Sequence, residues 1–110
     1  MIYKVIPTPS FKKEVKSLFK RYKSLKSDLD KFTKSIEENP FQGSELSPGI
    51  RKVRMAIESK GRGKSAGARV ITYMTDDSTG KIWLLEIYGK SDFSSVKVDV
   101  IKQMIKDLFG

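Results

Sequence analysis

The spacing of apolar residues changes once along the chain, and this change limits the fold more than any other feature of the sequence. In the first part, apolar side chains recur every three or four positions, the period of an amphipathic helix: Phe11, Val15, Leu18, Tyr22, Leu25, Leu29, Phe32 and Ile36. From Ile50 onward they recur at every second position, as in a strand with one buried face. A helical part followed by a strand-rich part indicates an α+β protein.

The helical part is expected to contain two helices. Thr8-Pro9 is a typical start, because threonine accepts a hydrogen bond from a free amide of the first turn and proline loses nothing at the first helical position. We expect a break near Ser24 to Ser27, since serine caps helices well and a single rod would leave its apolar seam exposed. An intermolecular coiled coil is the alternative. Asn39-Pro40 ends the helical stretch, and a loop is expected over Gly43–Gly49.

Four strands are predicted. One precedes the helices, and three follow them as a meander with turns between them: Ile2–Ile6, a strand from Ile50, Ala68–Met74 and Lys81–Tyr88. In the last strand, Trp83, Leu85 and Ile87 alternate with other residues and are expected on one face of the sheet.

A last helix is expected after the strands, capped by Ser94 or Ser95. Together the elements predict an α+β fold in which two N-terminal helices and a C-terminal helix pack on one face of a mostly antiparallel four-stranded sheet. The 110 residues, of which 38% are hydrophobic, are enough to close one core, so a single domain over residues 1–110 is expected.

The chain contains no Cys and no His. Disulfides, the usual zinc sites, a thiol nucleophile and a histidine general base are thereby excluded, and neither a metal nor a cofactor is expected. No stretch approaches the ~18 to 20 apolar residues of a membrane helix, and the first residues lack the apolar region of a signal peptide. We therefore expect a cytoplasmic protein, with its chemistry carried by Lys, Arg, Tyr or carboxylate side chains.

Positive charge is concentrated in one short segment. The whole chain has a formal net charge of +9, and residues 51–70, with seven basic side chains and one acidic, account for +6 of it. Four of these seven are arginines, whose planar guanidinium fits phosphate oxygens well. The partner that this segment favours is a polyanion.

Several of these cations are expected to meet on the sheet. If Val53 and Val70 point inward on neighbouring strands, Lys52, Arg54 and Arg69 share the outer face, and Tyr88 and Lys90 end the next strand beside them. The glycine-rich segment that follows the first meander strand adds three more cations: Lys60, Arg62 and Lys64. Such like charges repel one another unless an anion lies between them.

Each of these features has an alternative explanation. The cations form structural salt bridges if Glu58, Glu86 or Asp92 pairs with them. Tyr88 is otherwise an ordinary core tyrosine, and the glycine-rich segment is otherwise a flexible hairpin connection.

Three blocks of the sequence resemble the core of RelE/HigB-type toxins: Gly49-Ile50-Arg51-Lys52-Val53-Arg54, residues 59–71 (Ser-Lys-Gly-Arg-Gly-Lys-Ser-Ala-Gly-Ala-Arg-Val-Ile) and residues 84–91 (Leu-Leu-Glu-Ile-Tyr-Gly-Lys-Ser). Residues 7–11 and Glu38-Asn39-Pro40 are also similar, so the resemblance spans nearly the whole chain. It implies a ribosome-dependent endoribonuclease that cuts messenger RNA and is neutralised by a cognate antitoxin protein.

The resemblance also implies roles for single residues. Arg69 would stabilise the pentavalent phosphorus, and Arg54 and Lys90 would complete the catalytic cluster. The RNA backbone would be held by further cations: Lys52, Lys60, Arg62 and Lys64. Where relatives often have a catalytic Tyr or His after the position of Lys90, this chain has none, so its general base is unassigned, and Ala66 stands where the family often has Gly.

The absence of the usual metal ligands favours attack by the RNA 2′-hydroxyl on its own adjacent phosphate. Tyr88 or Lys90 can accept the proton only if the surrounding cations lower its pKa, which their clustering predicts. The alternative function is a non-catalytic basic module that binds nucleic acid or an acidic protein. A related toxin branch that acts on gyrase is a further possibility, although the basic middle segment favours RNA.

Overall fold

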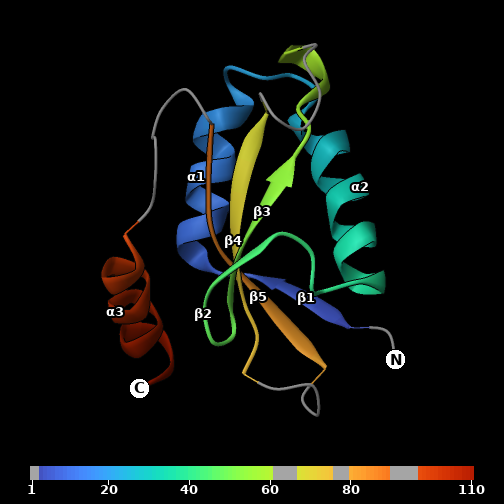
Figure 1. Ribbon diagram of the computed structural model, residues 1–110. Coiled ribbons are helices and arrows are strands. Elements are labelled where there is room, and N and C mark those ends of the chain that lie inside the picture. Colours follow the sequence, from blue (N-terminus) through green and yellow to red (C-terminus); the bar gives the residue numbers. More distant parts are fainter. Residues whose placement is uncertain (1–2, 61–66, 76–79, 90–96) are drawn as a thin grey trace.

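The computed structural model describes residues 3–60, 67–75, 80–89 and 97–110. Along these residues, one strand and two helices come first, four strands follow, and a helix comes last (Figure 1). The elements in chain order are β1 (Lys4–Pro7), α1 (Pro9–Phe19), α2 (Leu25–Glu38), β2 (Ser44–Ser47), β3 (Ile50–Met55), the short 3-10 helix η1 (Glu58–Lys60), β4 (Ala68–Tyr73), β5 (Lys81–Gly89) and α3 (Val98–Phe109).

The sheet has five strands in the order β1-β5-β4-β3-β2. β1 runs parallel to β5, and the other neighbouring pairs are antiparallel. The expected α+β class is confirmed, but the expected number of four strands is wrong, because β2 forms where a loop was predicted. Glycines and proline around β2 are typical of a turn, yet Arg51 holds this segment beside β3 through the carbonyls of Gln42 and Gly43, at 2.9 and 3.0 Å.

The two predicted N-terminal helices are confirmed, but the break between them lies earlier than expected, at residues 20–24, and α2 already includes Ser27. Thr8 Oγ1 accepts a hydrogen bond from the amide of Phe11 at the start of α1. Ser24 precedes α2 but makes no side-chain cap hydrogen bond, because its hydroxyl donates to Asp28 Oδ2 instead. Because the two helices fold back on each other, the apolar seam lies inside the protein. Most of its members are buried: Phe11, Leu18, Leu25, Phe32 and Ile36.

The three helices do not share one face of the sheet, and this part of the prediction is wrong. α1 and α2 pack with one set of inward strand residues, including Val53 and Val70. α3 packs through Ile101 with a second set that includes Ile71 and Tyr88. In Figure 1, α2 and α3 lie at opposite sides of the view. The sheet is therefore the middle layer between two apolar clusters, which the alternation of a strand cannot reveal when both of its faces are covered.

Within β5, one expected face is wrong. Ile71 is paired with Glu86, but the next residue of β4, Thr72, is paired with Leu84, so the register shifts by one residue of β5. This bulge places Trp83 and Leu85 on the α3 side, whereas Ile87 packs on the side of α1 and α2. An extra residue in one strand reverses the alternation, and period-two counting cannot anticipate it.

α3 begins at Val98, later than expected, and the predicted caps Ser94 and Ser95 lie outside the described residues. Its C-terminal end is fixed by aromatic contacts, with the Phe109 ring centroid 4.8 Å from that of Trp83 and 5.6 Å from that of Tyr73. No helix in the described part of the chain is both long and apolar enough to cross a membrane.

Candidate nucleic-acid site

Arg54, Arg69 and Tyr88 form one row across three neighbouring strands. Arg54 of β3 is paired directly with Arg69 of β4, and Arg69 is paired directly with Tyr88 of β5. Directly opposite residues of antiparallel strands point to the same face, with Cβ atoms roughly 4.5 to 5.5 Å apart. The structure therefore brings together three of the four residues predicted to be catalytic, and we call them the Arg–Arg–Tyr row.

The exposure of this row falls steeply from one end to the other. Arg54 is exposed, whereas the exposed fractions of Arg69 and Tyr88 are only 9% and 5%. Arg69 donates a hydrogen bond from Nη1 to the carbonyl of Ala68 at 3.3 Å. Among the described residues, Arg54 has no hydrogen-bond or ion-pair partner. An anion that approaches from solvent therefore meets Arg54 first.

The other predicted RNA-binding cations are placed less uniformly. Lys52 is partly buried on β3 and is paired with Ile71, one step along the same sheet face from the Arg–Arg–Tyr row. Lys60 lies over the ring of Tyr22, with Nζ 5.2 Å from its centroid, so it already has a contact within the protein. The remaining candidates lie outside the described residues: Arg62, Lys64 and Lys90.

Tyr88 does not titrate as the sequence suggested. Burial raises the pKa of its phenol, and the carboxylate of Glu86 raises it further, while Arg69 acts in the opposite direction and does not prevail. The expected lowering of the Tyr88 pKa is therefore wrong, because removal from water outweighs the nearby cation. A phenol in this state remains protonated at neutral pH and is suited to donate a proton or a hydrogen bond.

From the sequence, Glu86 is expected only as a structural salt-bridge partner. It lies on β5, two residues before Tyr88, and is paired with Ile71 on the same face as the Arg–Arg–Tyr row. Burial raises the pKa of its carboxyl. Its place two residues from Tyr88, at the strand period, could have marked it as a site candidate.

Glu14 of α1 is a second carboxyl that sequence reasoning missed. Pairing of β1 with β5 ends at Pro7 and Leu84. Beyond that point, the Ile87 amide donates a hydrogen bond to Glu14 Oε1 at 3.2 Å. Burial, helped by the nearby charge of Glu86, raises the pKa of Glu14 to about 7, against the lowering effect of this hydrogen bond. Nothing in the sequence pattern of α1 indicates this contact with a distant strand.

The predicted alternative of structural salt bridges is only partly tested. Glu58 pairs with Lys31, at 3.9 Å, rather than with the cations of the sheet. Asp92 lies outside the described residues. Within the described part of the chain, no group of three or more acidic side chains is arranged to hold a metal ion.

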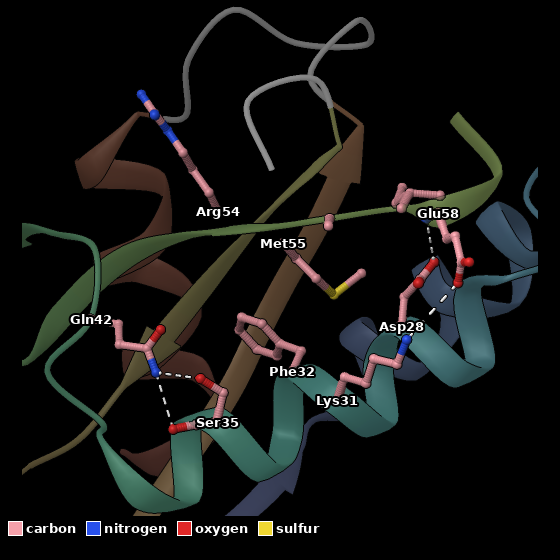
Figure 2. A pocket seen from close by; sticks show the side chains of 10 residues that line it. Asp28, Lys31, Phe32, Ser35, Gln42, Arg54, Met55 and Glu58 are labelled. Atoms are coloured by element: carbon pink, nitrogen blue, oxygen red, sulfur yellow. Dashed lines mark hydrogen bonds and ion pairs between the residues drawn. The ribbon is translucent and has the colours of Figure 1, made fainter. Parts of the chain in front are cut away.

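A mostly apolar groove of about 490 Å³ lies between α2 and the end of β3. Figure 2 shows Phe32 and Met55 pointing into this groove and Arg54 pointing away from it. Polar contacts flank it, including the hydrogen bond from the Glu58 amide to Asp28 Oδ2 at 3.1 Å. The groove therefore lies on the opposite side of β3 from the Arg–Arg–Tyr row.

No family model matches the sequence. Among solved structures, the chain is similar to a double-arginine mutant of the Escherichia coli toxin RelE in the free state, with a TM-score of 0.64 and 15% identity over 99% of this chain and all of that one. The chain has a RelE-like toxin fold. The isolated E. coli RelE toxin is also similar, with a TM-score of 0.58 and 13% identity over the same shares of the two chains. At such low sequence identity, the similarity to RelE shows a shared fold and nothing more.

Proposed function

We propose that this chain is a toxin of a toxin-antitoxin system: an endoribonuclease that cuts messenger RNA on the ribosome, in the cytoplasm, and is neutralised by a cognate antitoxin protein. The observation that carries the proposal is the Arg–Arg–Tyr row on the sheet of a RelE-like fold. Two adjacent arginines and a protonated phenol are suited to a phosphodiester that gains negative charge during reaction.

The proposed reaction is an internal transfer that consumes no water. The 2′-oxygen of the RNA forms a bond to the adjacent phosphorus while the bond from phosphorus to the 5′-oxygen breaks, leaving a 2′,3′-cyclic phosphate and a 5′-hydroxyl. Arg54 and Arg69 offset the extra negative charge on the phosphoryl oxygens. Tyr88, which is protonated, donates the proton that the departing 5′-oxygen needs.

The remaining cations serve to hold RNA. Lys52 lies next to the row, and the outlying cations Lys60, Arg62 and Lys64 would contact the phosphates of neighbouring nucleotides, with Lys90 completing the catalytic cluster. Since Arg69 is only 9% exposed, contact with a phosphate requires neighbouring groups to move. Such a site favours a reaction in which the ribosome positions the message, because correct orientation supplies much of the rate.

Alanine at Arg69 tests this proposal. After induced expression, primer extension on translated messages maps the cuts, and co-sedimentation measures association with ribosomes. We expect Arg69→Ala to lower cleavage about 10²- to 10³-fold and to leave association nearly unchanged. If the protein is instead a non-catalytic basic module, the wild-type chain produces no cuts and Arg69→Ala merely weakens binding.

A further inference from the structure

Glu86 is placed to take part in the chemistry of the Arg–Arg–Tyr row. Along β5 it lies two residues before Tyr88, and the two side chains point to the same face of the sheet. Across the sheet it continues a second row, in which Lys52 is paired with Ile71 and Ile71 with Glu86. The phenol of Tyr88 responds electrostatically to both Arg69 and Glu86, so it lies within range of both charges.

In the described part of the chain, the structure gives the Glu86 side chain no stabilising partner. Its carboxyl is partly buried, yet within the described residues it makes no hydrogen bond and no ion pair. Two other carboxyls withdrawn from water accept hydrogen bonds: Asp28 from Ser24 Oγ at 2.7 Å, and Glu14 from the Ile87 amide. Glu37 of α2 is also partly buried without a partner among the described residues, but α2 packs on the other side of the sheet from the Arg–Arg–Tyr row. A carboxylate withdrawn from water without a partner destabilises the fold. Because Glu86 bears this cost beside the Arg–Arg–Tyr row, it is a candidate for a functional role.

We propose that Glu86 is the general base that accepts the proton of the attacking 2′-hydroxyl, an inference that rests on the ribonuclease function proposed above. As the 2′-oxygen bonds to phosphorus, its proton passes to a Glu86 carboxylate oxygen, and the proton of Tyr88 passes to the departing 5′-oxygen. Exchange with water then returns both side chains to their starting states. The base that sequence reasoning left unassigned is thereby a residue of β5, next to the proposed acid.

Other groups in this region are less suited to the role. Tyr88 remains protonated, and Glu14 is engaged with the Ile87 amide at the edge of the sheet. The raised pKa of Glu86 also makes its carboxylate a stronger base than an exposed glutamate.

The test compares Glu86→Gln with Glu38→Gln, which removes the same charge from an exposed residue at the end of α2. Cleavage of a translated message is measured as a function of pH, with ribosome co-sedimentation and thermal unfolding as controls. We expect Glu86→Gln to lower cleavage about 10²- to 10⁴-fold, to abolish the acidic limb of the pH–rate profile, and to leave ribosome association intact. Glu38→Gln should cleave like the wild type.

A third variant, Glu86→Asp, separates a base from a structural role. It retains a carboxylate that is one methylene shorter, so it should keep a slow rate and the acidic limb that Glu86→Gln loses. Cleavage by Glu86→Gln at the wild-type rate, or an Asp variant no faster than the Gln variant, overturns the assignment while leaving the nuclease function standing. A wild-type chain that cuts no message refutes the nuclease function itself, and this inference with it.

Discussion

Replacing Glu14 by glutamine should change how the stability of the protein depends on pH. In the folded protein the pKa of this carboxyl is raised from 4.5 to about 7, chiefly by burial. Between these two values the folded chain binds more protons than the unfolded chain, so the free energy of unfolding falls as the pH rises through this window. Glutamine keeps the Oε1 acceptor for the Ile87 amide and removes the ionisation.

The size of this stability effect follows from the shift in the pKa of Glu14. A change in the pKa of Glu14 from 4.5 to about 7 corresponds to roughly 3.4 kcal/mol before screening by water is considered. Glu14 is only partly buried, and water screens part of the effect, so we reduce it to about 1.5 to 2 kcal/mol. For a chain of this length that is roughly 5 to 10 °C in Tm.

The assay is thermal unfolding of the wild type and Glu14→Gln at pH 5 and pH 8. At pH 5 both side chains are uncharged in the folded state and the two Tm values should lie close together, whereas at pH 8 the variant should be more stable by the stated amount. Comparing the two proteins cancels the other titrations. The Tm of Glu38→Gln, the exposed control, should change with pH in the same way as the Tm of the wild type. If Glu14→Gln also runs parallel to the wild type from pH 5 to pH 8, the burial argument for Glu14 is wrong.

Two further substitutions test other parts of the structure. Asp28→Ala removes the acceptor for both Ser24 Oγ and the Glu58 amide. In urea titration, this variant should have a free energy of unfolding about 2 to 3 kcal/mol lower than the wild type. The control, Asp30→Ala on the exposed side of α2, should change the free energy of unfolding by about 0.5 kcal/mol or less. Tyr88→Phe keeps the buried ring but removes the proposed acid, so cleavage of a translated message should fall about 10²-fold or more at a stability loss of about 1 kcal/mol. A phenylalanine variant that cuts as fast as the wild type would exclude Tyr88 as the acid.

The local elements could be predicted because their signals are local. Thr8-Pro9 starts α1, and alternation from Ile50 yields β3, because capping and alternation act over a few residues. β2 was missed because glycine and proline flank it as in a turn, whereas its stabilising contacts come from β3, through backbone pairing and through the Arg51 side chain, which binds the carbonyls of Gln42 and Gly43 just before it. The side of the sheet on which α3 packs was also missed. The pattern of an amphipathic helix shows which of its faces is buried, but not against which surface that face packs.

Of the candidate site too, the strand neighbours could be predicted from the sequence, whereas the burial of the side chains could not. That Arg54 and Arg69 would be neighbours follows from two alternation patterns joined by a hairpin, and the structure pairs them directly. How deeply each side chain is buried does not follow from these patterns, because burial depends on every element that packs on the sheet. The wrong sign of the Tyr88 pKa shift came from this gap: the cations were visible in the sequence, but the burial that outweighs them was not.

Two local penalties coincide on one face of the sheet. Arg54 directly opposite Arg69 places like charges side by side, and Glu86, nearby on β5, keeps a partly buried carboxyl without a partner in the described part of the chain. Arg54 lies on β3 and Glu86 on β5, with β4 between them, so these two opposite charges are not neighbours and do not relieve either penalty by pairing. Because Glu86 and Arg54 form no ion pair in the described structure, the face retains an accessible cation and a base in separate positions, which is the arrangement required to bind a phosphate and deprotonate its neighbouring hydroxyl at the same time.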